Sequence, residues 1–170
     1  MRDRLGIYIH IPFCVSKCGY CDFYSIAGGK QKMPDYQSAL LSHIRESADI
    51  MQGYEIDSIY IGGGTPSCYG AKRIVEILDE LKRMGNVRLD SEITVEVNPD
   101  TVRLDELKLL RSEGVNRLSV GVQSANNDIL KIIGRRHNFL QAQTAVEIAR
   151  TAGFENVSLD LIYGLPSQTK

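Results

Sequence analysis

Short apolar segments rich in β-branched residues alternate along this chain with amphipathic helical patterns. The five segments short enough to be strands are Leu5–Ile11, Ser58–Ile61, Ile93–Val97, Arg117–Val122 and Val157–Tyr163. Strands that alternate with helices pair in parallel and are joined by right-handed crossovers. The sequence therefore predicts the α/β class with one parallel sheet, either doubly wound or barrel-like.

The segments between the predicted strands carry apolar residues on one helical face. These residues are Leu40, Leu41, Ile44, Ala48 and Met51, then Ile74, Ile77, Leu78, Leu81 and Met84, then Leu104, Leu107 and Leu110, followed by helical patches at Asp128–Ile133 and Leu140–Ala152. Glycines that suit helix C-caps follow them, at Gly53, Gly85, Gly114 and Gly153. The predicted element order is β(αβ)₄, without a linker or a second domain.

The charge and hydropathy of the chain argue against several classes of function. Its 20 basic and 21 acidic side chains leave a net charge of −1, and no window gathers enough Lys or Arg to follow a phosphate backbone. Nucleic acid is therefore not an expected partner. The N-terminal apolar run is broken by His10 and Pro12 and is too short to span a bilayer, so membrane contact is not indicated and a cytoplasmic location is predicted.

The last ten residues, Leu161–Lys170, contain a Gly-Leu-Pro turn and no helical pattern that could cover the fifth strand. An open parallel edge is unusual in a complete domain. We therefore expect residues 1–170 to be the N-terminal part of a core domain that is truncated after its fifth strand. The C-terminal strands of that domain, and a C-terminal domain, are expected to lie outside this sequence.

Three of the four cysteines lie close together in Cys14-Val-Ser-Lys-Cys18-Gly-Tyr-Cys21, directly after the first predicted strand. In a reducing compartment such a group more often binds metal than forms disulfides. Thiolates suit iron–sulfur clusters and zinc. A structural zinc site needs a fourth ligand, which His10 or Cys68 could supply, whereas three thiolates on a cluster leave one iron open. Both readings stay open here, although Cys68, standing alone, is predicted to be a small buried residue.

Glycines and polar residues mark the ends of the other predicted strands. Gly62-Gly-Gly-Thr-Pro66 follows the second strand, where missing side chains would let a ligand lie against the backbone N–H and C=O groups. Glu96, Gln123 and Asp160 lie in or at the end of the next three strands. The carboxyl ends of parallel strands converge on one face, which predicts a shared site. For Glu96, a salt bridge to a neighbouring arginine is the alternative.

The spacing Cys-x₃-Cys-x₂-Cys, with aromatic Tyr20 before the last cysteine, resembles the signature loop of the radical S-adenosylmethionine (SAM) superfamily. The resemblance implies a partial parallel (β/α) barrel, a [4Fe–4S] cluster on Cys14, Cys18 and Cys21, and SAM bound to the open iron. It also implies that one electron from the reduced cluster cleaves SAM to methionine and a 5′-deoxyadenosyl radical. An electron donor such as flavodoxin or ferredoxin is then an expected partner.

Blocks along the whole chain resemble, more narrowly, the oxygen-independent coproporphyrinogen III oxidase-like group. The blocks are Tyr8-Ile-His-Ile-Pro-Phe-Cys14, Gly62-Gly-Gly-Thr-Pro-Ser67, Glu96-Val-Asn-Pro99, Arg117-Leu-Ser-Val-Gly-Val-Gln123 and Asp160-Leu-Ile-Tyr-Gly-Leu-Pro166. The resemblance implies that Tyr8, Gly63 and Glu96 contact the cluster-bound SAM. The positions that hold a second SAM in the oxidase are matched by Tyr20, Gly64, Thr65, Gln123, Arg135 and Asp160. For Arg135, a solvated charge at a helix end is the alternative.

Two departures favour the heme-chaperone branch of that group over the oxidase. The oxidase has a fourth cysteine two residues after the third, where this chain has Phe23, and it has a substantial segment ahead of its cysteine loop. The expected function is binding of heme and its transfer to an acceptor protein. Oxidative decarboxylation of coproporphyrinogen in porphyrin biosynthesis is the alternative, and a zinc-stabilised binding domain is a distant one.

No catalytic residue and no heme ligand are assigned from the sequence. His10 follows the family pattern beside the cluster. His43 and His137 lie in or beside helical stretches and are expected to be surface or packing residues.

Overall fold

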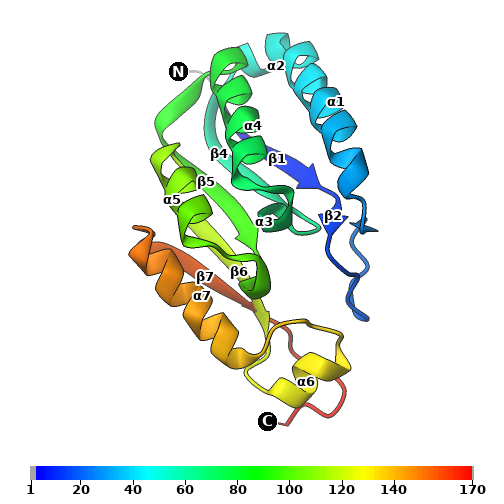
Figure 1. Cartoon of the computed structure of the whole chain (residues 1–170). Coiled ribbons are helices and arrows are strands. Elements are labelled where there is room, and N and C mark those ends of the chain that lie inside the picture. Colours follow the sequence, from blue (N-terminus) through cyan, green and yellow to red (C-terminus); the bar gives the residue numbers. More distant parts are fainter. Residues whose placement is uncertain (1–2, 170) are drawn as a thin grey trace.

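The structure, a computed structural model, describes residues 3–169 and is built on a five-stranded parallel sheet (Figure 1). The strands of this sheet are β1 (Arg4–Ile11), β4 (Glu55–Gly63), β5 (Val87–Val97), β6 (Arg117–Gln123) and β7 (Asn156–Leu161). The α-helices are α1 (Met33–Glu46), α2 (Ala48–Gln52), α3 (Pro66–Tyr69), α4 (Ala71–Met84), α5 (Leu104–Ser112), α6 (Asn127–Ile132) and α7 (Phe139–Thr151). Two short strands, β2 (Phe13–Cys14) and β3 (Ile26–Ala27), pair with each other, and 3₁₀ turns η1 and η2 lie at Lys30–Lys32 and Pro99–Thr101.

The strand order decides between the two predicted kinds of sheet. The strands lie side by side in chain order, β1-β4-β5-β6-β7. A doubly wound sheet reverses its strand order part-way, whereas a barrel wall adds each strand beside the last. Right-handed crossovers that progress in one direction place their helices on one face, and α1, α4, α5 and α7 pack side by side in that order (Figure 1). The predicted α/β partial barrel is confirmed.

The helices end largely where the glycines predict. Gly53 and Gly85 are the C-caps of α2 and α4, and Gly114 and Gly153 follow α5 and α7 with left-handed backbone. In the part of the chain that the structure describes, no helix combines the length and the apolar character needed to cross a membrane.

The two faces of the sheet differ in polarity because successive strand residues point to opposite sides. One face lies under the helices, where Ile59, Val95 and Leu118 are at most 1% exposed. The residues of the other face are mostly polar and include Tyr60, Thr94, Glu96, Ser119 and Asp160. This polar face corresponds to the inside of the partial barrel, so it is the surface on which a ligand site can form.

The edge strand β7 is only partly covered. Its apolar residues Leu159 and Leu161 are 51% and 69% exposed, and residues 162–169 contain no helix. Among the described residues, no helix follows β7.

Strand β5 starts earlier than the apolar pattern predicts. Its register with β4 moves from Ile56 opposite Val87 to Ser58 opposite Glu92, so five steps along β5 match two along β4. The extra residues form a bulge, and their charged side chains interrupt the apolar pattern by which a strand is recognised in the sequence.

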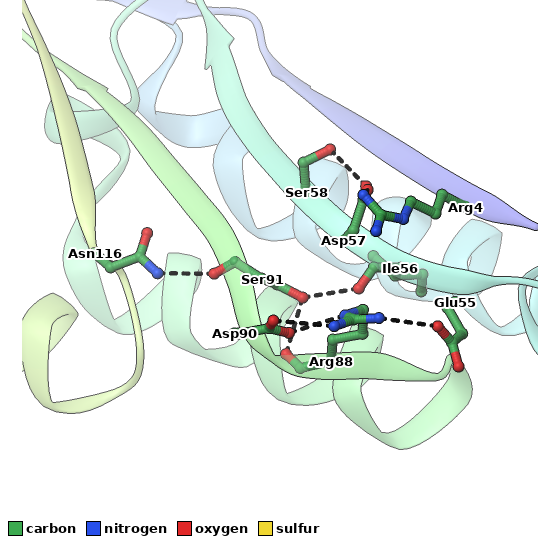
Figure 2. A network of polar contacts seen from close by, with 9 residues as sticks. All are labelled: Arg4, Glu55, Ile56, Asp57, Ser58, Arg88, Asp90, Ser91 and Asn116. Carbon is green, nitrogen blue, oxygen red and sulfur yellow. Dashed lines mark hydrogen bonds and ion pairs between the residues drawn. The ribbon is translucent and has the colours of Figure 1, made fainter.

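A polar network at the amino-terminal ends of the strands holds this bulge (Figure 2). The Arg88 guanidinium donates to both carboxylate oxygens of Asp90, at 2.8 and 3.0 Å, and to Glu55 at 3.1 Å. Ser91 Oγ donates to the Ile56 carbonyl at 2.7 Å. The side-chain amide Nδ2 of Asn116 donates to the Ser91 carbonyl at 2.7 Å, which connects the start of β6 with the bulge.

Replacing Asn116 tests whether the network stabilises the fold. In the wild type, the Asn116 side chain lies 2.7 Å from the Ser91 carbonyl oxygen and 2.8 Å from the Ile93 nitrogen, and Asn116→Ala removes both hydrogen bonds. We expect the free energy of unfolding to fall by about 1–3 kcal/mol, measured by urea denaturation. Asn156→Ala, at an exposed position, is the control and should change it by less than about 0.5 kcal/mol. Equal losses in the two variants would contradict this role.

Candidate functional site

A cavity of about 380 Å³ lies at the carboxyl ends of the strands. This volume is in the range of small-molecule sites. The predicted site residues that line it are Cys14, Cys18, Cys21, Tyr20, Gly63, Gly64, Thr65, Glu96, Gln123, Arg135 and Asp160. The structure thus brings together residues from the cysteine loop, the glycine turn and three further strand ends.

Tyr8 is the one predicted site residue that does not line this cavity. Its ring is 57% exposed and stacks on Tyr60, with 6.1 Å between the ring centroids. Its hydroxyl lies 3.1 Å from His10 Nδ1, and His10 Nε2 lies 2.9 Å from the carbonyl oxygen of Tyr24. Tyr8 and His10 therefore connect β1 with the segment that follows the last cysteine of the loop.

The cysteine loop is held by backbone hydrogen bonds at its two sides. The Gly28 N–H donates to the Cys14 carbonyl at 3.2 Å, and the Gly19 N–H donates to the Ile133 carbonyl at 3.1 Å, just after α6. All three thiols are half-buried and free of disulfides. Within residues 3–169, no three Cys, His, Asp or Glu side chains gather closely enough to bind a single metal ion. A [4Fe–4S] cluster binds its thiolates on separate irons, so three cysteines on one loop can serve as its ligands.

The glycine turn packs tightly against the cysteine loop. The N–H of Gly64 donates to the Ile11 carbonyl at 2.8 Å, and the N–H of Thr65 donates to the Phe13 carbonyl at 2.8 Å. A Cβ on Gly64 would lie 2.8 Å from the same Phe13 oxygen. The interpretation that missing side chains expose the N–H groups of this turn to a ligand is therefore wrong. These donors are used within the protein, and glycine is needed for backbone packing.

Glu96 is held by a tyrosine and by the glycine turn. Tyr60 Oη donates to Oε1 at 2.8 Å, and the Gly63 N–H donates to Oε2 at 3.0 Å. The alternative of a salt bridge to an arginine is not found among the described residues. Burial raises the pKa of Glu96, while the hydrogen bonds from Tyr60 and Gly63 act against that rise. Burial, together with the bond to Glu96, raises the pKa of Tyr60 to about 12, so Tyr60 remains a donor at neutral pH.

The ends of β6 and β7 contribute Gln123 and Asp160. The exposed Asp160 carboxylate accepts from Ser119 Oγ at 2.8 and 2.9 Å. Gln123 has a φ of 69°, at an irregular point in the register between the two strands. Residues other than glycine rarely adopt this conformation, and it clusters at binding sites.

Arg135 is not the solvated helix-end charge that was the alternative. It is half-buried, and Nη2 donates to Asn98 Oδ1 at 2.9 Å and to the Gly121 carbonyl at 2.5 Å. Nη1 lies 3.9 Å from Cys18 Sγ. The Arg135 side chain thus links the strand ends to the cysteine loop.

Sequence reasoning missed three residues that contact the predicted ones: Tyr60, Asn98 and Ser119. Residues two apart on a strand share a face, so Asn98 lies on the same side of the sheet as Glu96. Tyr60 and Ser119 lie on that side because of the strand register. The period of two could have identified Asn98, but the register needs the structure.

Other candidates behave as packing or surface residues, as predicted. Cys68 is half-buried, its Sγ donates to the Phe13 carbonyl at 3.3 Å, and burial raises its pKa to about 11, which suits an inert thiol. His137 is buried with Nε2 3.1 Å from the Val122 carbonyl oxygen, and His43 is exposed.

A barrel-type parallel sheet that presents three cysteines and buried polar groups at its strand ends defines an α/β protein built to hold a cofactor. The sequence profile of the Radical SAM superfamily matches residues 8–170, and the chain belongs to this superfamily.

The chain is similar to proteins of two related functions. It is 43% identical to the heme chaperone HemW of Haemophilus influenzae, over 97% of this chain and 44% of that protein. It is 36% identical to the oxygen-independent coproporphyrinogen III oxidase of Salmonella typhimurium, over 97% of this chain and 36% of that protein. The structure of coproporphyrinogen III oxidase (HemN) from Escherichia coli, a radical SAM enzyme, matches with a TM-score of 0.90 and 35% identity, over 99% of this chain and 39% of that chain. The chain therefore spans less than half the length of these proteins.

Membership of the superfamily implies SAM and a [4Fe–4S] cluster, and the residues of the cavity fit both. Three free thiols line one cavity that also has room for a small molecule. Two of the sulfurs already accept hydrogen bonds, Cys14 from Thr65 Oγ1 at 3.5 Å and Cys18 from Arg135. Such bonds are typical of thiolates that ligate clusters.

The raised pKa of Glu96 predicts a specific pH dependence of stability. The native state binds the Glu96 proton more tightly than the unfolded chain does. The stability gained from this difference is complete below the unfolded pKa of 4.5 and is lost as pH rises through the native pKa. We expect the wild type to lose free energy of unfolding relative to Glu96→Gln as pH rises above about 4.5, measured by denaturation at each pH. A constant difference between the two proteins would contradict this.

Proposed function

We propose that Cys14, Cys18 and Cys21 bind a [4Fe–4S] cluster whose open iron takes SAM. The observation that carries this proposal is that three free thiols of one loop line a single cavity at the strand ends. When bound, the cluster supplies the electron for reductive cleavage of SAM. The residues of the chain supply the three thiolate ligands, bind SAM and keep water from the site.

The same proposal assigns the SAM contacts. Tyr8, Gly63 and Glu96 contact the cluster-bound SAM, and the position of Glu96 on the cavity wall supports this role. For the oxidase, the second candidate function below, the residues proposed to hold a second SAM are Tyr20, Gly64, Thr65, Gln123, Arg135 and Asp160. All of these six residues line the cavity, which supports their grouping.

For the whole protein, we propose a heme chaperone that binds heme and transfers it to an acceptor protein. The higher identity to HemW, 43% against 36% for the Salmonella oxidase, supports this branch. Phe23 supports it as well, because it stands where the oxidase has its fourth cysteine. Its ring is 69% exposed beside the cavity, and an exposed aromatic ring suits contact with a flat porphyrin. Oxidation of coproporphyrinogen is the second candidate, favoured by the similarity to the E. coli oxidase structure.

Further parts of this proposal concern the surroundings of the chain. An electron donor such as flavodoxin or ferredoxin reduces the cluster. A cytoplasmic location suits the four free cysteines, since a reducing compartment keeps them available for a cluster. Residues 1–170 form the N-terminal part of the radical SAM core domain, in keeping with the 44% of the HemW length that they match.

Single cysteine variants test the cluster. We expect the anaerobically reconstituted wild type to contain about four iron and four sulfide per chain, and Cys14→Ala, Cys18→Ala and Cys21→Ala each to lose most of both, since each removes a ligand. Iron, sulfide and zinc analysis measures this. Cys68→Ala is the matched control and should keep the iron and sulfide. Zinc without sulfide in the wild type would contradict the cluster.

A comparison of heme with coproporphyrinogen separates the two candidate functions. We expect the whole protein to bind heme, and to leave coproporphyrinogen unchanged when SAM and a reductant are present. Phe23→Ala should weaken heme binding by roughly tenfold, since it removes an aromatic contact, as followed by absorbance titration. Ile50→Ala, at another exposed apolar position, is the control. Conversion to protoporphyrinogen would contradict the chaperone and favour the oxidase.

A further inference from the structure

We infer that Asn98 is a positioning residue for the cysteine ligands, at the centre of a hydrogen-bonded brace between Cys14 and Cys18. The inference rests on the proposed function, because it concerns the ligands of the proposed cluster. Thr65 Oγ1 lies 3.5 Å from Cys14 Sγ and 3.1 Å from Asn98 Nδ2. On the other side, Arg135 Nη2 lies 2.9 Å from Asn98 Oδ1, and its Nη1 lies 3.9 Å from Cys18 Sγ.

The direction of each hydrogen bond in the brace follows from Arg135. A guanidinium has donors and no acceptor, so Asn98 must turn its Oδ1 toward Arg135 and its Nδ2 toward Thr65. The Thr65 hydroxyl accepts the bond from Nδ2, and its single proton is then free to point at Cys14 Sγ. Asn98 therefore determines the direction of a hydrogen bond that it does not make itself.

The backbone of Asn98 is held in place on both sides. Ser67 Oγ accepts its N–H at 3.1 Å, and Thr101 Oγ1 donates to its carbonyl at 2.9 Å. The two hydroxyls also bond to each other at 2.5 Å. Asn98 is followed by the buried Pro99, which begins η2. An amide anchored in this way can orient groups that contact metal ligands.

The brace gives two of the three cysteines a hydrogen-bond donor. Cys14 receives one from Thr65 and Cys18 one from Arg135, while no donor to Cys21 Sγ is found in residues 3–169. Hydrogen bonds to cysteine sulfur stabilise the reduced, more negative state of an iron–sulfur cluster. The brace is therefore expected to raise the reduction potential of the cluster, besides holding its ligands.

The test measures the reduction potential of the reconstituted cluster in the whole protein, by a redox titration followed by EPR without SAM. Thr65→Val and Asn98→Leu each remove one link, and each is expected to shift the potential to a more negative value. Thr65→Ser keeps the hydroxyl and should keep the wild-type potential. Because Asn98 acts on Cys14 through Thr65 and on Cys18 through Arg135, Asn98→Leu should cause a smaller shift in a Thr65→Val background than in the wild type, arising from the Cys18 side alone.

Asn116→Ala is the control for general loss of stability, because Asn116 also bridges two elements (Figure 2). It lies just before the start of β6, whereas Asn98 lies just after the end of β5, at the opposite end of the sheet. The Asn116→Ala variant should unfold more easily and keep the wild-type potential. Equal potentials in the wild type, Thr65→Val and Asn98→Leu, or fully additive shifts in the double variant, would overturn the brace and leave the proposed function intact. A wild type that takes up no iron would overturn the proposed function, and the brace with it.

Discussion

Two backbone hydrogen bonds, from Gly64 to Ile11 and from Thr65 to Phe13, fix the site on which the remaining contacts depend. They join the turn after β4 to the segment that leads into Cys14. A Cβ at Gly64 would meet three backbone atoms of that segment at 2.8 to 2.9 Å, so any side chain there would displace the cysteine loop. The position of the first thiol therefore depends on a glycine that offers no reactive group of its own.

The anchoring continues from the cysteine loop into the core. Phe13, next to Cys14, stacks on Tyr69 of α3 with 5.5 Å between centroids and 3° between planes. Tyr36 of α1 packs its edge against Phe13 at 5.4 Å. Phe13 and Tyr69 are each 1% exposed. The loop that carries the proposed cluster ligands thus starts from closely packed aromatic residues, which limits how far Cys14 can move.

The sequence was sufficient for the sheet and for part of the cavity wall because the strand ends follow local patterns, whereas Tyr20 and Arg135 were assigned by the family resemblance. Alternation of strands and helices predicts parallel pairing, and parallel pairing gathers Glu96, Gln123 and Asp160 at one end. The start of β5 was missed because its residues are charged and bulged, so no apolar period marks them. The partners Tyr60 and Ser119 were missed for another reason. Which residues of neighbouring strands lie opposite each other depends on register, and register is set by the packing of the whole sheet.

The contacts of Arg135 and Thr65 bear on the choice between the two candidate functions. The resemblance implies that both residues bind a second SAM, whereas in the structure both form hydrogen bonds to the cysteine loop and to Asn98. The Thr65 hydroxyl has one proton, which it donates to Cys14 Sγ. A further ligand could therefore only donate a hydrogen bond to the Thr65 oxygen. The Arg135 Nε is also a donor, and it is buried with no hydrogen-bond partner among residues 3–169. A second SAM at these two residues would therefore meet a hydroxyl that can only accept, and an Arg135 with three of its five N–H groups already used within the protein. A heme chaperone, which is not expected to oxidise coproporphyrinogen, can keep the brace closed.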